Sequence, residues 1–512
     1  MITIFKEHCQ RIREIQSMLA QDQSLVEIWE HSWTDICNTD PCVKEFLKKE
    51  DIREPLTPRD ALYGGRTEAF CLHKSVSSPF QIKYVDVVSL YPYVQKYGLY
   101  PLGHHIIITE NINYEEGFRG KPYFGIAKCV ILPPRGLLIP VLPARINKKL
   151  HFSCCRLCSE HNQRSICNHE DQDRAFEGTW CTPEIDKALQ KGYKLVRVYE
   201  VWHYEKTAVY NPQIKQGGLF TSYINQAIKE KQEASGFPTS VKTQNEKQEY
   251  IREYFEREGI ALELDKIEKN PGRRAVAKLF ANSQWGYLAM QTNKPKFGII
   301  TKAADWFKML ATEETVIHNA QFTDEPECML FVSYSDKDSH HIENGKTNVI
   351  VAAFVTCNAR LKLYEELDKL GDRVLYCDTD SIFYISHPTL YDVPIGSYLG
   401  EFTNEVDEDD HIIEFVSAGP KNYAYKTIKG KTACVVKGFA LNNLASEGIN
   451  FESIRKIVQL NDNTKLEVDQ LLFSRNKQQM TVQTNVVKKK YSMVFDKRAV
   501  NFVTFETLPY GF

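Results

Sequence analysis

The sequence predicts an α+β protein, because strand-rich and helix-rich stretches occupy different parts of the chain. Residues 82–90 form a run of β-favouring residues, and residues 374–385 have the pattern of a β-hairpin with an acidic tip. Residues 215–256 and 271–290 place Lys, Glu, Gln, Leu and Ala at helical spacing. We therefore expect an antiparallel sheet accompanied by a helical hairpin.

Prolines predict where two of these elements end. Pro92 follows Tyr91 and is expected to stop the strand of residues 82–90 and to force a turn. Asn270-Pro271-Gly272 is expected to form the turn between the two helical stretches.

Length and composition favour a globular protein with several sub-domains. The chain has 512 residues, of which 43% are apolar and 12% aromatic, enough to bury substantial cores. Lys and Arg total 64 and Asp and Glu total 66, so the net charge is close to zero. Nucleic-acid binding would therefore depend on local basic surface and on metal ions.

The N-terminal stretch has no signal for secretion or membrane insertion. Residues 1–19 are amphipathic and lack a long apolar run, so we expect a soluble, intracellular protein without a membrane partner. Its 14 cysteines are expected to be reduced thiols, some of them in a metal site, without disulfides.

Three aspartates form the main candidate site. Asp86 ends the first strand, and Asp378 and Asp380 lie beside each other at the hairpin tip. Two carboxylates this close repel each other unless a cation lies between them. Joining a nucleoside triphosphate to a 3′-hydroxyl needs two Mg²⁺ ions held by such oxygen ligands. Taken alone, Asp86 would more often be a cap or a salt-bridge partner, so its assignment depends on the other two.

A helical face supplies the groups that a triphosphate requires. Arg274, Lys278 and Asn282 are spaced by four residues and therefore share one side of a helix. The two cations could contact the phosphates, with the amide nearer the base. Basic residues at this spacing, without other motifs, are more often a solvated stripe.

Several segments, in this order, resemble motifs of family B DNA polymerases. Motifs A, B and C are matched by Asp86-x2-Ser89-Leu90-Tyr91-Pro92, Lys278-x3-Asn282-Ser283-x2-Gly286 and Tyr376-x-Asp378-Thr379-Asp380-Ser381. Lys421-Asn422-Tyr423 resembles the Lys-x-Tyr motif of the family, which contacts the primer end. The resemblance implies a DNA-directed DNA polymerase with the right-hand fold of palm, helical fingers and thumb.

The resemblance also implies roles for the matching residues. Asp86 and Asp380 would hold the two Mg²⁺ ions, with help from Asp378 and the carbonyl of Val87. Lys278 would neutralise charge on the phosphates and assist the leaving group, and the arginine one turn earlier would be a second cation.

Other matching positions would contact the nucleotide and the DNA. The backbone of Ser89, Leu90 and Tyr91 would hold the triphosphate, and the Tyr91 ring would lie under the incoming sugar and exclude a 2′-hydroxyl. Lys421 and Tyr423 would bind primer DNA.

Within family B, the spacing of the motifs resembles that of the protein-primed branch, including viral and Polinton or Maverick enzymes. About 190 residues separate Asp86 from Lys278, which leaves room for an insertion that contacts a priming protein. The stretches 59–69 and 178–184 look particularly like Polinton-type enzymes. Gly64 and Gly65 would form the template-contacting turn, although Leu62 stands where the family has an aromatic residue.

The resemblance defines the expected partners and one expected absence. Template and primer DNA, deoxynucleoside triphosphates and a priming terminal protein would be partners, in the nucleus if the host is a eukaryote. The 85 residues before Asp86 contain no Asp-x-Glu motif, so we expect no proofreading exonuclease domain.

A cysteine-rich stretch is a second candidate metal site. Cys155, Cys158, Cys167 and His169 are soft ligands at short spacing and could bind a structural Zn²⁺ tetrahedrally. The alternative is a group of exposed thiols in a loop without a metal.

The motifs divide the chain into seven predicted parts. These are 1–70, an N-terminal segment with the template-contacting turn; 71–109, palm; 110–214, an insertion resembling a terminal-protein region; 215–290, fingers; 291–345, a second insertion; 346–423, palm; and 424–512, thumb. Residues 471–500 contain seven Lys or Arg and one acid, which suits a duplex-gripping surface as well as an ordinary solvated face.

Two other functions remain open at this point. One is an inactive, element-derived protein that binds nucleic acid, although such a protein has no need for Asp86, Asp378, Asp380 and Lys278 together. The other is a polymerase that extends nucleic-acid primers. A reverse transcriptase would explain the acidic tip but not the helix of residues 278–286.

Overall fold

The chain forms two compact units in the computed structural model, Met1–Pro55 and Leu56–Phe512. The described residues are 2–19, 25–49, 54–110, 112, 123–323, 329–342, 345–460, 465–476 and 481–512. The first unit contains the helices α1 (Ile2–Met18), α2 (Glu30–Thr39) and α3 (Pro41–Lys49). Within the described ranges, no helix is long and apolar enough to cross a membrane.

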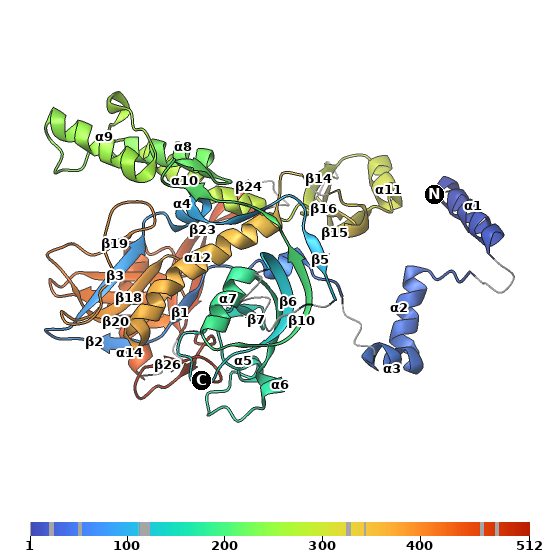
Figure 1. Cartoon of the computed structure of the whole chain (residues 1–512), viewed down its shortest axis with the longest axis horizontal. Helices are drawn as coiled ribbons and strands as arrows, with labels where there is room; N and C mark the ends of the chain where they lie inside the picture. The colour runs from blue at the N-terminus through green and yellow to red at the C-terminus, as the bar shows by residue number, and fades with distance from the viewer. Residues whose placement is uncertain are drawn as a thin grey trace. The chain divides into compact units, whose positions relative to one another are not determined.

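The second unit is organised around an antiparallel sheet of nine strands. Its central path runs β1-β17-β18-β3-β20-β21-β22, with β19 beside β3 and β2 beside β20 (Figure 1). The predicted α+β class is confirmed, and the predicted hairpin forms two of the central strands. The strand bounds are β1 (Thr67–Ala69), β2 (His73–Ser75), β3 (Gln81–Val87), β17 (Val374–Asp378), β18 (Ser381–Ser386), β19 (Phe402–Asn404), β20 (Ile412–Gly419), β21 (Asn422–Thr427) and β22 (Thr432–Val436).

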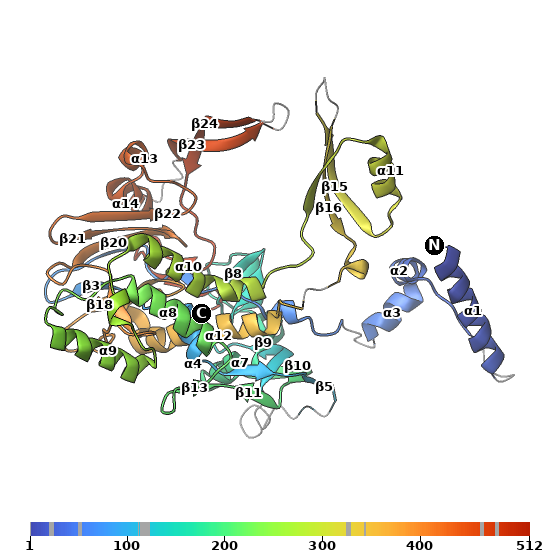
Figure 2. The same ribbon diagram turned by 90° about the horizontal axis from the view of Figure 1, so that it is seen from above.

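The two faces of this sheet pack against different helices. Along β3, Val85 and Val87 belong to the core that includes helix α12 (Val349–Leu370), whereas Ile82 belongs to the core that includes α14 (Phe451–Leu460). This alternation follows from the two-residue period of a strand. Figure 2 shows α12 and α14 on opposite sides of the sheet.

The strand at Asp86 ends earlier than expected, and Pro92 does not terminate it. Strand β3 stops at Val87, and helix α4 (Leu90–Tyr97) begins after Ser89, which has a left-handed φ of 54°. Pro92 lies in the first turn of α4. Proline is tolerated there because the first N–H groups of a helix have no intrahelical acceptor.

The predicted helical hairpin contains three helices, α8 (Thr221–Glu233), α9 (Gln244–Glu258) and α10 (Pro271–Leu288). Helices α8 and α10 pack against each other. Asn270 caps α10 by accepting a hydrogen bond from the Arg273 amide at 3.0 Å, and Pro271 begins the helix. Asn270-Pro271-Gly272 is therefore a helix start rather than a free turn.

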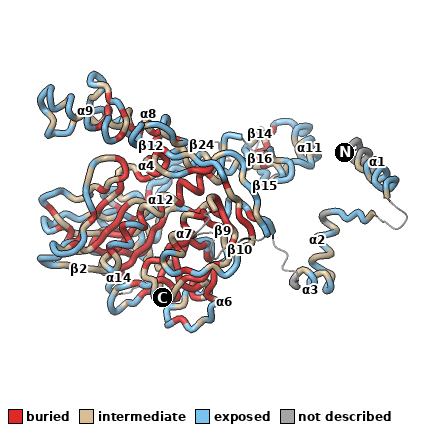
Figure 3. Tube along the Cα trace, in the orientation of Figure 1, coloured by how far each residue is buried: buried red, intermediate tan, exposed pale blue. Residues whose placement is uncertain are grey.

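Most of the predicted first insertion, residues 110–214, shares a core with the main sheet. A second sheet has the order β5-β10-β6-β9, and its Ile126 and Trp180 pack in the same cluster as Val85. Figure 3 shows buried residues continuing from the main sheet into this region. Residues 111 and 113–122 of the predicted insertion lie outside the described residues. The bounds are β5 (Ile106–Ile108), β6 (Gly125–Leu132), β9 (Phe176–Cys181), α7 (Thr182–Gln190) and β10 (Lys194–His203).

The predicted second insertion, 291–345, contains a small sheet with its own apolar cluster. Strands β14 (Lys296–Ile300) and β15 (Thr315–Phe322) flank β16 (Leu330–Asp336), and α11 (Ala303–Ala311) lies between β14 and β15 in sequence. Ile300, Leu330 and Val332 form the cluster.

The predicted thumb, 424–512, begins within the main sheet, and its end returns to the region of β1. Strands β21 and β22 extend the main sheet to Val436, so the predicted boundary at 424 falls inside β21. Residues 496–512, called here the C-terminal segment, return to β1, where the Thr507 amide donates to the Phe70 carbonyl at 2.9 Å. Between them lie α13 (Asn443–Gly448), α14 and the long hairpin β23 (Leu466–Asn476) and β24 (Thr481–Tyr491). Lys477, one of the basic residues counted above, lies outside the described part.

A buried ion pair connects the long helix α12 to α7, and the same arginine holds the turn before β1. Arg360 donates to both carboxylate oxygens of Glu184 at 2.7 Å, and both side chains are buried. The same guanidinium donates to the carbonyls of Tyr63 and Gly64 at 2.7 and 3.0 Å. Removing it would leave the buried Glu184 carboxylate and the buried Tyr63 carbonyl without this donor.

Arg360→Met is therefore expected to lower the free energy of unfolding by about 3–5 kcal/mol. Lys431→Ala removes an exposed pair with Asp407 and is the matched control, with an expected cost below about 1 kcal/mol. Urea unfolding of the two variants measures the difference. Equal costs would show that the Arg360 network does not stabilise the fold.

Candidate functional site

The register of the main sheet brings the three predicted aspartates to one end of adjacent strands. Asp378 on β17 pairs with Ser381 on β18, and Ser381 pairs with Asp86 on β3. Asp380 lies in the turn between β17 and β18, and its carbonyl accepts a hydrogen bond from the Val87 amide at 2.8 Å. Residues almost 300 positions apart in sequence therefore meet across three strands.

Burial and repulsion make this end of the sheet unfavourable for carboxylate charge. The pKa of Asp86 is raised to about 7 by burial first and then by Asp380 and Glu405. Burial and the neighbouring Asp378 raise the pKa of Asp380 to about 6. A cation at this position would relieve the repulsion, and the hard oxygen donors suit Mg²⁺.

Asp378 has partners of its own and differs from the other two aspartates in this respect. Its carboxylate accepts a hydrogen bond from Thr67 Oγ1 at 2.8 Å and forms an ion pair with Lys421 Nζ at 2.8 Å. The repulsion expected between Asp378 and Asp380 is therefore partly relieved by Lys421. Thr67 was not expected from the sequence, and only the pairing of β1 with β17 places it here.

The start of α4 lies directly after Asp86 and carries the predicted triphosphate-binding residues. The first N–H groups of a helix have no intrahelical acceptor and attract anions. Leu90 is buried, so any nucleotide contact at this position would use its backbone. Ser89 Oγ accepts a hydrogen bond from Lys231 Nζ at 2.8 Å.

Lys231, on α8, is a cation that the sequence did not single out. Burial first, and then the nearby Arg274 and Lys278, lower its pKa to about 8, while Asp86 partly offsets this shift. The lysine lies among many Lys, Glu and Gln residues in a helical stretch, so no sequence pattern distinguishes it. Its contact with Ser89 identifies it.

The predicted helical face on α10 is turned toward the same region. Lys278 is exposed, and its charge lowers the pKa of both Asp86 and Asp380. Arg274 Nε donates to Ser235 Oγ at 3.1 Å. Asn282 is half-buried on the same helix. Helices α8 and α10 thus present several cations to the acidic end of the sheet.

Tyr91 is supported by an aromatic partner on α10. Its ring stacks on Trp285, with centroids 4.8 Å apart and ring planes 10° apart. Trp285 lies within the motif that resembles motif B, but its contact with Tyr91 was not expected. The stack connects α4 to α10 and fixes the Tyr91 ring.

The predicted template-contacting turn packs directly against the acidic turn. A Cβ on Gly65 would lie 2.9 Å from the Thr379 side chain, and the Thr379 amide donates to the Arg66 carbonyl at 2.7 Å. Glycine at 65 is therefore required by close approach. Gly64 and Gly65 both line the cavity described next.

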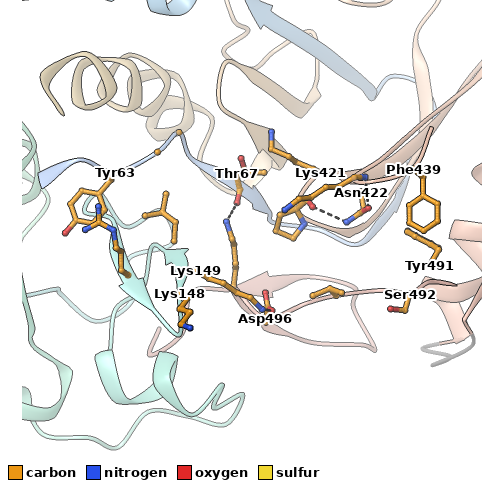
Figure 4. Close-up of a pocket in the computed structure, with 18 of the residues that line it drawn as sticks. Tyr63, Thr67, Lys148, Lys149, Lys421, Asn422, Phe439, Tyr491, Ser492 and Asp496 are labelled. Carbon is orange, nitrogen blue, oxygen red and sulfur yellow. Dashed lines mark hydrogen bonds and ion pairs between the residues drawn. The ribbon is translucent and has the colours of Figure 1, made fainter. Parts of the chain in front are cut away.

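A strongly basic cavity of about 680 Å³ lies beside these turns. Its seven cations face one acid, Asp496, so the cavity suits a polyanion. Lys148 and Lys149 enter from one side, and Phe439 and Tyr491 lie at the opposite side (Figure 4). The cations are Arg145, Lys148, Lys149, Lys421, Lys437, Lys490 and Lys497.

The two residues of the predicted Lys-x-Tyr motif lie in different environments. Lys421 lines the cavity, whereas Tyr423 is 7% exposed and packs among Tyr84, Tyr376 and Phe383. Burial of Tyr423 in the sheet core leaves little of its side chain for a DNA contact. Asn422, between them, does line the cavity.

The predicted zinc ligands are also brought together. Cys155, Cys158, Cys167 and His169 offer ligand atoms that all lie within 4.8 Å of one another. The three thiols are buried, so the alternative of exposed thiols in a loop is wrong. They form a small separate core with Tyr510.

Comparison with known proteins finds a family model that matches part of the chain. Residues 51–247 match the family model described as DNA polymerase type B, organellar and viral. That match includes Asp86 and ends before Lys278 and the acidic turn. No curated protein matches the sequence.

The fold is similar to solved structures of Phi29 DNA polymerase. The structure complexed with single-stranded DNA has a TM-score of 0.50 and 16% identity, over 90% of this chain and 66% of that chain. The ternary complex with primer-template DNA and incoming nucleotide substrates has a TM-score of 0.50 and 14% identity, over 93% and 75%. The predicted right-hand fold is confirmed.

Lys231 is expected to contact the phosphates of an incoming nucleotide. Lys231→Ala should raise the KM for deoxynucleotides by about tenfold or more, because a charged hydrogen bond is lost. The charge of Lys231 is present at pH 7 and is lost as pH rises above its pKa of about 8. The KM of the unmodified chain should therefore rise between pH 7 and 9, whereas the KM of Lys231→Arg should not.

Lys229→Ala is the matched control, because Lys229 lies on the same helix but pairs with Glu263. The KM for deoxynucleotides is measured by steady-state incorporation over that pH range. The four proteins are the unmodified chain, Lys231→Ala, Lys231→Arg and Lys229→Ala. An unchanged KM in Lys231→Ala would remove Lys231 from the nucleotide site.

Proposed function

We propose that this chain is a family B DNA-directed DNA polymerase that adds deoxynucleotides to a 3′-hydroxyl by a two-metal mechanism. The observation that carries the proposal is the convergence of Asp86 and Asp380 at one end of β3 and β18, opposite the cations of α8 and α10. An anion-binding helix start and a basic cavity adjoin the same point.

The carboxylates fit the metal ions that such a reaction requires. Their donors are hard oxygens, and burial and mutual repulsion raise the pKa of both carboxyl groups, which a bound cation would relieve. Two Mg²⁺ ions held by Asp86, Asp380 and the Val87 carbonyl, with Asp378 nearby, would activate the hydroxyl and stabilise the leaving pyrophosphate.

The side chains of the fingers would bind and position the triphosphate. As the primer 3′-oxygen bonds to the α-phosphorus, the bond to the bridging oxygen breaks and pyrophosphate leaves. Lys278, Lys231 and Arg274 would neutralise charge on the phosphates during this step. The start of α4 would supply backbone N–H donors.

The basic cavity would hold the DNA next to this site. Lys421 lines the cavity and also pairs with Asp378, so the cavity and the acidic turn share a residue. Gly64 and Gly65 form part of the same wall. Phosphate contacts by the lysines would place the primer end near Asp380 without reading its sequence.

Initiation from a protein hydroxyl is the finer part of the proposal. It is supported by the motif spacing and by local sequence resemblance to protein-primed enzymes. The enzyme would carry out protein-primed replication of a mobile element or virus. Its docking surface would lie on the region between Asp86 and Lys278, where the second sheet is found.

Asp86→Asn and Asp380→Asn are each expected to lower nucleotide incorporation on the order of 10³-fold or more, because each removes a metal ligand. The assay extends an annealed DNA primer and, in parallel, labels a candidate priming protein with nucleotide. Both reactions should be lost, while DNA binding and thermal stability are retained.

Asp407→Asn, at an exposed position paired with Lys431, is the control and should keep normal activity. Near-normal extension by either site variant would refute the two-metal assignment. Extension of the annealed primer without labelling of any priming protein would refute protein priming but would leave the two-metal assignment standing.

Tyr91 is expected to exclude ribonucleotides, because a fixed ring under the sugar leaves no space for a 2′-hydroxyl. Tyr91→Ala should incorporate ribonucleotides more readily. Trp285→Ala should have a weaker effect in the same direction, since it removes the ring on which Tyr91 stacks, and Trp285→Phe should restore discrimination. The ratio of kcat/KM for deoxy- and ribonucleotides is the measurement, and an unchanged ratio in Tyr91→Ala would contradict this role.

A further inference from the structure

Three cysteines and a histidine converge in a part of the protein that the proposed reaction does not use. Cys155 and Cys158 lie at the start of α5 (Arg156–Glu160), and Cys167 and His169 lie in the loop before α6 (Asp171–Arg174). Exposure of the three cysteines is 0%, 0% and 5%.

The distances within this cluster match a tetrahedral zinc site. Nδ1 of His169 lies 3.5, 3.3 and 3.6 Å from the sulfurs of Cys155, Cys158 and Cys167. With Zn–S bonds of about 2.3 Å and Zn–N bonds of about 2.1 Å, a tetrahedral ion would separate sulfur and nitrogen by about 3.6 Å. The four ligand atoms, which all lie within 4.8 Å of one another, are therefore placed to surround a Zn²⁺ ion.

The surroundings support a metal rather than simple packing of thiols. The Cys158 amide is directed at the Cys155 sulfur at 3.4 Å, which would stabilise a thiolate ligand. Arg135 donates to the carbonyls of Cys167 and His169 at 2.9 and 2.7 Å and so fixes the second pair of ligands. Apolar packing alone would not bring an imidazole nitrogen to the same point as three sulfurs.

The adjacent Cys154 provides an internal comparison. It is as buried as Cys155, but its sulfur donates to the Leu137 carbonyl at 3.4 Å and it is not one of the converging ligands. A buried cysteine in this segment can therefore pack without joining the cluster.

The cluster is joined to the C-terminal segment by backbone hydrogen bonds. The amides of Cys154 and Cys155 both donate to the Tyr510 carbonyl, at 2.8 and 3.2 Å. Gly511 has a φ of 80°, and a Cβ there would lie 2.1 Å from the Cβ of Cys155. The C-terminal segment thus fits against the ligand loop only because residue 511 is glycine.

The same cluster is joined to the hairpin β7 (Ala144–Ile146) and β8 (Lys149–His151) that enters the basic cavity. The Asn147 side chain donates to the Glu160 carbonyl at the end of α5, at 3.0 Å. Asn147 and Lys148 form the two-residue turn of the hairpin, both with positive φ. This turn carries Lys148 and Lys149 into the cavity.

The hairpin and the C-terminal segment meet at the cavity wall. Lys149 forms an ion pair with Asp496, and Lys497 donates to the Thr67 carbonyl at 3.3 Å. The three cations Lys148, Lys149 and Lys497 therefore belong to two segments that are both attached to the cysteine cluster. We call them the basic wall.

We propose that Cys155, Cys158, Cys167 and His169 bind a structural Zn²⁺ ion that joins the hairpin β7–β8 to the C-terminal segment and so holds the basic wall in its DNA-binding arrangement. The inference rests on the proposed function in one respect, that the cavity binds DNA. Zinc binding by the cluster does not depend on that function.

The first experiment measures metal in the purified full chain. About one zinc per chain should remain after dialysis, and Cys158→Ser should lose it, because three ligands hold zinc far less tightly than four. Cys154→Ser is the matched control and should keep the metal. Absence of zinc from the unmodified chain, even after incubation with Zn²⁺, would overturn the proposal.

The second experiment measures binding of a labelled primer-template duplex without Mg²⁺ or nucleotide, over a range of salt concentrations. Removing zinc with a chelator should weaken binding and reduce the slope of log K against log salt by about 2 to 3, the number of lost phosphate contacts. Adding Zn²⁺ back should restore both. Unchanged binding by the zinc-free chain would overturn the role of the ion in the basic wall.

Gly511→Ala tests the attachment of the C-terminal segment without removing a zinc ligand. All four ligands remain, so zinc content should be retained, whereas DNA binding should weaken because the segment no longer fits against Cys155. Normal DNA binding by this variant would contradict the proposed connection. A chain that binds zinc and duplex but incorporates no nucleotide would refute the polymerase proposal and leave this inference standing.

Discussion

Strand β18 pairs with β17 on one side and with β3 on the other, and the site depends on this double pairing. A shift of one residue in either register would turn one carboxylate to the opposite face of the sheet, because side chains alternate along a strand. The faces are not interchangeable, since one packs on α12 and the other on α14. The two cores therefore enforce the register that brings Asp86 next to Asp380.

The carboxylates at this end of the sheet are surrounded by cations from several parts of the chain. Buried carboxylates repel each other, and cations from three separate regions lie near them and reduce this repulsion. These are Lys421 after β20, Lys231 on α8 and Lys278 on α10. Only Lys421 forms an ion pair with an aspartate of the site. The others remain available for an anionic substrate, and the carboxylates remain available for metal ions.

The C-terminal segment connects the cysteine cluster to the same sheet. Arg498 lies within 3.5 Å of Glu68, and Thr507 donates through its hydroxyl to the Ala69 carbonyl at 2.7 Å. Both partners lie on β1, which pairs with the strand that ends in Asp378. A structural ion would thus stabilise the wall of the DNA cavity through contacts that continue to the acidic turn.

Local patterns in the sequence determined the elements that carry the site. The β-favouring run of residues 82–90, the hairpin around Asp378 and Asp380, and the four-residue spacing of Arg274 and Lys278 depend only on neighbours in the chain, so these elements could be predicted. The converging cysteines and histidine were also visible as short spacings.

The tertiary structure decided the contacts that have no local signal in the sequence. It placed Lys231 beside Ser89, stacked Tyr91 on Trp285, buried Tyr423 in the sheet and returned residues 496–512 to β1. Each of these depends on contacts between segments far apart in sequence, whose free energy comes from packing that only the complete fold creates.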